Sequence, residues 1–118
     1  MKKLISTLVI TLIIFSSSAF AQKKTEEIKI QTSAQCGQCK DRIEKAMAFE
    51  KGVISSNLNL DDKVLTVSYN PVKTTPEKIR KAVNAVGYDA DDTKANPKAY
   101  ADLPGCCKKP DDPDHVEH

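Results

Sequence analysis

Apolar side chains recur at regular intervals between residues 26 and 90, and the interval changes along the segment. Ile28 and Ile30 alternate with charged and polar residues, which is typical of a strand with one buried face. Residues 37–50 change to helical spacing, with charged residues on the remaining faces. The apolar positions of this stretch are Ile43, Ala46 and Met47. The pattern predicts a strand followed by an amphipathic helix that ends near Gly52.

Two further alternating stretches, residues 53–60 and 63–69, flank the pair Asp61-Asp62. Two short alternating runs separated by polar turn residues are typical of a β-hairpin. The apolar residues expected on its buried face are Leu58, Leu60, Leu65, Val67 and Tyr69. Asn70-Pro71 then ends the second strand.

A second helix is predicted to start at Thr75-Pro76-Glu77. Threonine is a favourable N-cap, proline suits the first helical position, and an acidic residue there complements the helix dipole. The apolar stripe of this helix is Ile79, Ala82, Val83 and Val86. Gly87 fits the left-handed position after the helix, and Tyr88 is expected to begin a short last strand.

The predicted order of elements in residues 22–90 is therefore β-α-β-β-α-β. This alternation, with a hairpin in its middle, matches the split βαβ arrangement of the ferredoxin-like fold. The predicted fold class is α+β, with an antiparallel sheet that carries two helices on one face.

The chain begins with Met1-Lys2-Lys3, continues with a short apolar core, and reaches Ala19-Phe20-Ala21. These three features predict a secretory signal peptide over residues 1–21, cleaved after Ala21. A retained membrane anchor is the alternative, but a span usually needs about 20 apolar residues. We therefore expect an exported protein, periplasmic or secreted, with no stable membrane anchor after cleavage.

Residues 91–118 differ in composition, because Asp, Lys, Ala and Pro dominate and apolar residues are few. We interpret them as a polar tail that is partly disordered and carries the pair Cys106-Cys107. His115 and His118 could act as weak metal ligands, but we favour the interpretation that they belong to a solvated tail end.

The charge balance and the low aromatic content argue against a nucleic-acid-binding protein. The chain has 18 basic and 16 acidic residues, and removal of Lys2 and Lys3 with the signal peptide leaves the two signs balanced. Tryptophan is absent and aromatic residues make up 5% of the chain, so stacking platforms for bases are few. We predict no binding to nucleic acid.

The candidate chemistry lies where the first strand passes into the first helix, in Cys36-Gly37-Gln38-Cys39. Residues i and i+3 on a first helical turn lie close together, so the two sulfurs can bind one soft ion or close a disulfide. The helix N-terminus stabilises a thiolate, and Lys40 and Arg42 add positive charge nearby. Since Gly37 places no side chain between the sulfurs, we expect an exposed site.

Two functions use such a pair. Paired thiolates select soft ions, so Cu(I) or Hg(II) is the expected cargo of a carrier or scavenger, with Zn(II) and Cd(II) as further candidates. The alternative is a thiol–disulfide oxidoreductase that cycles Cys36 and Cys39. No tryptophan precedes Cys36, and the order of elements differs from the thioredoxin arrangement. We therefore predict a metal-binding protein that is not an enzyme.

Cys106 and Cys107 form a second tight cluster, outside the predicted domain. Adjacent cysteines rarely pair with each other, so a shared ion, the pair Cys36/Cys39 or another molecule is the expected partner. The segment after residue 90 is long enough to reach any part of so small a domain. We expect these thiols to be additional metal ligands in a shared thiol cluster.

Taken together, the chain from Glu26 to Ala90 resembles the heavy-metal-associated domain of copper chaperones, metal-transporting ATPases and periplasmic mercury-binding proteins. Besides the cysteines, the resemblance rests on Gly52-Val53, on the run from Lys63 to Pro71, and on the helix exit at Gly87-Tyr88.

The resemblance implies that Cys36 and Cys39 bind the metal and that Tyr88 lies beside them. It also implies partners, namely a membrane transporter or a chaperone that donates or accepts metal. Family members usually have Gly-Met-Thr before the first cysteine, and here the corresponding residues are Ser33-Ala34-Gln35. The methionine that packs beneath the loop is therefore missing.

Overall fold

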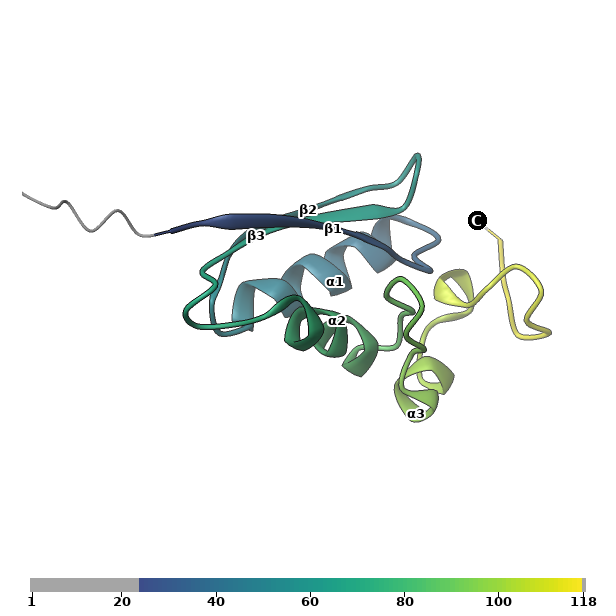
Figure 1. The fold of residues 1–118 in the computed structure, drawn as a ribbon. Coiled ribbons are helices and arrows are strands. Elements are labelled where there is room, and N and C mark those ends of the chain that lie inside the picture. The colour runs from purple at the N-terminus through teal and green to yellow at the C-terminus, as the bar shows by residue number, and fades with distance from the viewer. Residues whose placement is uncertain (1–23, 118) are drawn as a thin grey trace, which may run out of the picture.

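The computed structural model describes residues 24–117 (Figure 1). Its elements in chain order are β1 (Glu26–Gln31), α1 (Gly37–Phe49), β2 (Val53–Asn59), β3 (Val64–Tyr69), α2 (Pro76–Ala85), α3 (Pro97–Ala101) and the 3₁₀ turn η2 (Gly105–Cys107). The signal peptide predicted for residues 1–21 lies outside the described residues and stays a prediction.

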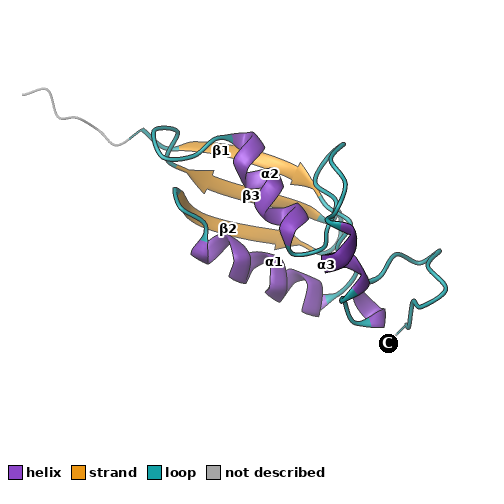
Figure 2. Ribbon diagram, turned by 90° about the horizontal axis from the view of Figure 1, so that it is seen from below, coloured by secondary structure: helices purple, strands orange, loops and turns teal. Residues whose placement is uncertain are grey.

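The three strands form one antiparallel sheet in the order β1-β3-β2, so β3 is the central strand. Leu65 of β3 pairs with Ile30 of β1 on one side and with Leu58 of β2 on the other, and all three side chains are buried. Helices α1 and α2 lie together on this face of the sheet (Figures 1 and 2). The predicted α+β class, a ferredoxin-like sheet with two helices on one face, is confirmed.

The hairpin has the predicted alternation, with Leu65, Val67 and Tyr69 of β3 buried. Leu60 differs from the prediction, because it is 39% exposed. Strand β2 ends at Asn59, so Leu60 belongs to the turn and no longer follows the strand's alternation.

Both helices bury the side chains that the spacing predicted. Helix α1 fully buries Ile43 and Met47, and α2 fully buries Ile79 and Val83. These four side chains belong to the core with Leu58, Leu65 and Val67 of the sheet. A helix face that packs on a sheet in this way holds its N-terminal turn in a defined place, which matters for α1 because that turn carries the thiols.

The boundaries of α2 also follow the predicted chemistry. The Thr75 hydroxyl oxygen accepts a hydrogen bond from the Lys78 amide at 3.3 Å, and Pro76 occupies the first turn. Gly87 has a φ of +103°, in the left-handed region that favours glycine. The helix therefore ends where the sequence predicted, and Tyr88 follows at once.

The expected strand after Tyr88 is reduced to a single antiparallel bridge between Ala90 and Thr32. Asp91 has a φ of +51°, so the chain turns away from the sheet at that residue. Its carboxylate accepts a hydrogen bond from the Gln31 amide at 2.9 Å, and its own amide donates to the Gln31 carbonyl at 2.8 Å. One residue thus caps the end of β1 where a longer strand was expected.

Residues 91–117 fold back on the domain. Leu103, Cys106 and Cys107 are buried in the same core as the helices and strands. Figure 1 shows this segment, in yellow-green and yellow, beside the end of the domain where α1 begins. The tail therefore covers the end of the molecule that carries the first cysteine pair.

Within residues 24–117, no helix has the length and apolar character needed to cross a bilayer.

Candidate metal centre

The first cysteine pair lies at the N-terminus of α1. Cys36 is the N-cap residue, with extended backbone (φ −151°, ψ 177°), and its carbonyl accepts the first helical hydrogen bond from the Lys40 amide at 3.1 Å. Cys39 lies in the first turn, and its Sγ is 3.5 Å from the Sγ of Cys36. Both thiols are free, so the pair is in the reduced form that binds metal.

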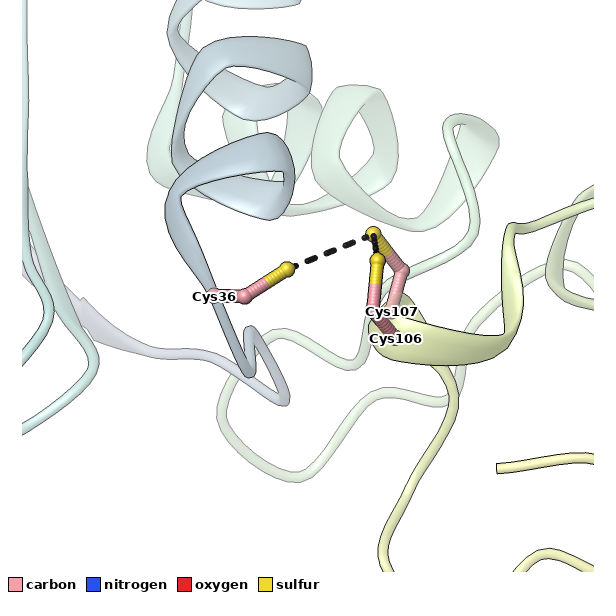
Figure 3. A group of neighbouring side chains, drawn as sticks. All are labelled: Cys36, Cys106 and Cys107. Carbon is pink, nitrogen blue, oxygen red and sulfur yellow. Dashed lines mark hydrogen bonds between the residues drawn. The ribbon is translucent and has the colours of Figure 1, made fainter. Parts of the chain in front are cut away.

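The tail brings the second pair to the same place. Turn η2 positions Cys107 with its Sγ 3.9 Å from that of Cys36, and Cys106 with its Sγ 4.0 Å from that of Cys107. The sulfurs of Cys36, Cys106 and Cys107 all lie within 4.8 Å of one another (Figure 3). Residues from α1 and η2, far apart in the sequence, thus form one cluster of thiols.

Exposure of the site differs from the prediction. Cys36 is half-buried, Cys39 is fully buried, and Cys106 and Cys107 are 6% and 1% exposed. The tail is the physical reason, because it covers the end of α1 that would otherwise face solvent. On the outer side the loop is open, since a Cβ added at Gly37 would meet no atom within 4 Å.

Hydrogen bonds favour the thiolate form of Cys36. Burial opposes ionisation, but the hydrogen bonds that the Cys39 amide, the thiols of Cys39 and Cys106, and the Gln38 amide offer to the sulfur outweigh it, so the pKa of Cys36 is lowered. This agrees with the expected effect of a helix N-terminus.

Lys40 was also expected to favour the thiolate, but its ammonium is engaged elsewhere. It pairs with the Glu44 carboxylate at 2.9 Å and donates to the Leu58 carbonyl at 2.7 Å, on the side of β2. The backbone amides of the first turn, and not Lys40, therefore stabilise the thiolate of Cys36.

The thiols of Cys106 and Cys107 are harder to ionise than that of Cys36. Burial, followed by the neighbouring thiol of Cys36, raises the pKa of Cys106. Burial and the neighbouring Cys39 thiol raise the pKa of Cys107 further. In the metal-free protein Cys36 is therefore the thiol that ionises readily, and the tail supplies neutral thiols that must lose protons before they can bind metal.

Tyr88 lies where the family resemblance implied. Its side chain is fully buried, and within the described chain its hydroxyl has no hydrogen-bond partner. Burial, and then the thiols of Cys107 and Cys39, raise its pKa. The hydroxyl is thus neutral and lies close to the thiols of Cys39 and Cys107.

A pocket of about 310 Å³ opens beside the cluster. Its lining includes Cys36, Cys106 and His115. His115 Nδ1 lies 2.8 Å from the Lys108 carbonyl and so donates to it, which leaves Nε2 as the nitrogen with a free lone pair. His118, the other histidine considered as a ligand, lies outside the described residues.

Sequence reasoning missed the residues that dock the tail. Asp89 and Lys109 form an ion pair with Nζ and Oδ2 2.7 Å apart. The Tyr100 hydroxyl donates to the Asp112 carboxylate at 2.7 Å and accepts from the Lys109 amide at 3.0 Å. The only sequence signals were Tyr100 and Leu103, two apolar anchors in a polar stretch.

Comparisons with known proteins show which family the chain is related to. A family model, the heavy-metal-associated domain, matches residues 33–89. Copper chaperone CopZ of Staphylococcus epidermidis is 35% identical over 65 residues, which are 55% of this chain and 96% of that protein. A copper-exporting P-type ATPase of Staphylococcus saprophyticus is 37% identical over 59 residues, which are 50% of this chain and 7% of that protein.

A solved structure described as CopZ metallochaperone matches with a TM-score of 0.53 and 27% identity, over 55% of this chain and 98% of that chain. The chain therefore belongs to the heavy-metal-associated domain family. At the level of the family, this membership supports binding and transfer of metal and a protein that is not an enzyme. The matched segment ends at Asp89, so Cys106 and Cys107 lie beyond it.

Proposed function

We propose that this protein is an exported carrier or scavenger of a soft metal ion, held by the thiolates of Cys36 and Cys39. The observation that carries the proposal is the 3.5 Å separation of these two sulfurs at the N-terminus of α1, in a chain of the heavy-metal-associated family. Dithiolate sites prefer Cu(I) and Hg(II) to harder ions. The copper relatives make Cu(I) the first cargo to test, with Hg(II) second and Zn(II) or Cd(II) after them.

Transfer proceeds by exchange of thiolates. A partner's thiolate bonds to the carried ion and forms a three-coordinate intermediate, and one of the two cysteines then leaves. The charge of the ion does not change, and the released thiolate takes up the proton that the incoming thiol lost. Cys36 is the natural exchanging ligand, because it is half-buried whereas Cys39 is fully buried.

The partner we propose is a membrane transporter or a chaperone that donates or accepts the same ion. The relatives support this, since one is a copper chaperone and another is a copper-exporting ATPase that contains a homologous segment. The proposed location is the periplasm or the extracellular medium, and it rests on the predicted signal peptide of residues 1–21.

The test is a Cu(I) titration of the reduced protein without oxygen, against a chromophoric chelator of known affinity. The double variant Cys36→Ser, Cys39→Ser is expected to lose affinity by more than about 100-fold, since loss of an outer-shell partner alone costs roughly 10–100-fold. The matched control is Cys106→Ser, Cys107→Ser, which leaves the first pair in place. Unchanged affinity in the first double variant would overturn the proposal.

A further inference from the structure

The tail adds two sulfurs to a site that the family model describes without it. The match ends at residue 89, yet Cys107 approaches Cys36 as closely as a metal-bound neighbour would. The four thiols are contributed by two segments, the first turn of α1 and the turn η2.

The distances between sulfurs indicate a coordination number above two. With metal–sulfur bonds of about 2.3 Å, two sulfurs on opposite sides of one ion are about 4.6 Å apart, whereas trigonal and tetrahedral sites have edges of about 4.0 and 3.8 Å. The separations are 3.9 Å for Cys36–Cys107, 4.0 Å for Cys106–Cys107 and 3.5 Å for Cys36–Cys39. The first two match the trigonal edge, and the third edge of that triangle, between Cys36 and Cys106, is no longer than 4.8 Å.

The tail is held in this position by contacts remote from the sulfurs. Lys109 pairs with Asp89, and Leu103 packs at Gly87, where an added Cβ would lie 3.2 Å from the leucine Cδ2. The Ala99 carbonyl oxygen approaches the same position to 3.0 Å. The placement of Cys106 and Cys107 therefore depends on a docking surface and not on sulfur contacts alone.

Tyr88 is an independent observation that points to a ligand. A buried hydroxyl without a partner is costly, and natural proteins rarely leave one unsatisfied. This hydroxyl is fully buried and lies close to the thiols of Cys39 and Cys107, but in the described part of the chain it makes no hydrogen bond of good geometry with either thiol or with any other group. Thiolates that bind a metal accept hydrogen bonds, so a metal-loaded cluster would supply the missing acceptor.

We propose that Cys106 and Cys107 are further thiolate ligands of the ion carried by the first pair, and that Cys36, Cys106 and Cys107 form a three-sulfur site that the tail closes. This inference rests on the proposed function and deepens it. The open form, with the tail undocked, binds an ion through Cys36 and Cys39 and exchanges it with partners. The closed form retains the ion.

Closure is an exchange of thiolates within one molecule. Cys36 keeps its bond to the ion, the thiolates of Cys106 and Cys107 form new bonds, and the thiolate of Cys39 leaves the ion. Cys106 and Cys107 each release one proton to solvent, the displaced thiolate of Cys39 takes one up, and no electrons are transferred. Because Cys36 is half-buried and lines the pocket with Cys106 and His115, a partner would reach the closed site through that pocket.

A three-sulfur site also defines a class of ligand that the first pair alone does not satisfy. Arsenite, as As(OH)3, takes three thiols: each thiol gives its proton to one hydroxyl, which leaves as water while the As–S bond forms. The closed site is therefore expected to bind arsenite in a 1:1 complex, and a pair of thiols is expected to bind it far more weakly. Arsenite is thus a probe that reports on the tail cysteines separately from the cargo.

The experiment compares the full chain with Cys106→Ser, Cys107→Ser and with Cys36→Ser, Cys39→Ser. X-ray absorption of the Cu(I) form is expected to show three sulfurs in the unchanged protein and two in the tail variant. Removal of Cu(I) by a chelator is expected to be at least tenfold faster from the tail variant, and its arsenite affinity at least tenfold lower. Two sulfurs in both proteins, with equal release rates and arsenite affinities, would overturn the inference.

Two controls keep the outcomes separate. Asp89→Asn retains all four thiols but weakens docking, so its release rate should fall between those of the unchanged protein and the tail variant. Circular dichroism checks that each variant keeps the fold.

If the tail variant behaves as the unchanged protein while Cys36→Ser, Cys39→Ser loses Cu(I), the inference fails and the proposed function stands. If only the tail variant loses Cu(I), the proposed function fails.

Discussion

The carboxylate of Asp89 and the ammonium of Lys109 form an ion pair, with Oδ2 and Nζ 2.7 Å apart. Asp89 is the last residue of the segment that the family model matches, and Lys109 follows the second cysteine pair by two residues. The contact therefore joins the heavy-metal-associated domain to the tail that covers its thiols. In keeping with this, Lys109 helps to hold the pKa of the Asp89 carboxyl below its usual value, against the opposing effect of burial.

Asp89→Asn tests whether this pair keeps the tail closed. Since the Lys109 side chain is 39% exposed, the pair is expected to contribute only about 0.5–1 kcal/mol. Its loss should increase the modification rate of Cys107 by a thiol reagent about 2–5-fold. Peptide mapping by mass spectrometry measures the rate at each cysteine. The control is Asp61→Asn, an exposed carboxylate in the β2–β3 turn, and equal effects of both variants would contradict the prediction.

The pKa shifts predict an order of reactivity among the thiols of the metal-free protein. The pKa of Cys36 is lowered from 9.0, whereas the pKa of Cys106 and that of Cys107 are raised. Only the thiolate reacts with iodoacetamide, so as the pH rises Cys36 should react first and the tail cysteines at distinctly higher pH. Mapping the labelled peptides across pH 6–10 checks the order, and earlier labelling of Cys107 would contradict it.

The oxidoreductase alternative makes its own prediction. The family membership supports a protein that is not an enzyme, so the mature protein should leave the rates of insulin reduction and of oxidative refolding close to the uncatalysed rates. The assay contains the reduced protein, excess dithiol and no metal. Turnover comparable with that of a thioredoxin-type enzyme would favour the alternative over the metal carrier.

Export is tested by the N-terminus of the mature protein. Expressed in full in a Gram-negative host, the chain should appear in the periplasmic fraction with Gln22 as its first residue, because the signal peptide is predicted to end at Ala21. Intact mass of the purified protein measures this directly. Leu12→Arg, which places a charge in the apolar core of the signal, is the control and should leave the protein uncleaved in the cytoplasm.

The sequence predicts most of the domain because its signals are local. Alternation around Ile30 and Leu65, helical spacing around Ile43, and the cap at Thr75 each depend on a few neighbouring residues, and the structure has all four features. The approach of Cys36 to Cys39 is local in the same sense, because the first helical turn alone brings residues i and i+3 together.

The tail could not be predicted to the same depth, because its position depends on contacts between distant residues. Cys36 and Cys107 are 71 positions apart, and chain length shows only that they can meet. The observed approach is supported by the pair Asp89–Lys109 and by the packing of Leu103 at Gly87, neither of which follows a periodic pattern. The predicted last strand is short for a similar reason, which is a contact between distant residues. The side chain of Asp91 accepts a hydrogen bond from the Gln31 amide, where a longer strand would have continued backbone pairing with β1.

Tyr88→Phe is expected to change the free energy of unfolding in opposite directions in the metal-free and the Cu(I) forms. In the metal-free protein the variant removes a buried hydroxyl that has no partner in the described part of the chain. An unsatisfied group of this kind costs about 1–3 kcal/mol, so the free energy of unfolding should rise by about 1 kcal/mol. In the Cu(I) form the hydroxyl is expected to donate to a metal-bound sulfur, so there the same variant should lower stability and weaken Cu(I) binding by about tenfold.

Urea unfolding without oxygen, in the metal-free and Cu(I) forms, measures both signs. Tyr100→Phe is the matched control, because its hydroxyl already donates to Asp112 at 2.7 Å and accepts from the Lys109 amide at 3.0 Å. Removal of that hydroxyl breaks existing bonds, so it should destabilise both forms by about 1 kcal/mol. If Tyr88→Phe instead destabilised the metal-free protein as Tyr100→Phe does, the Tyr88 hydroxyl would already have a partner there, and its assignment to the loaded thiol cluster would be wrong.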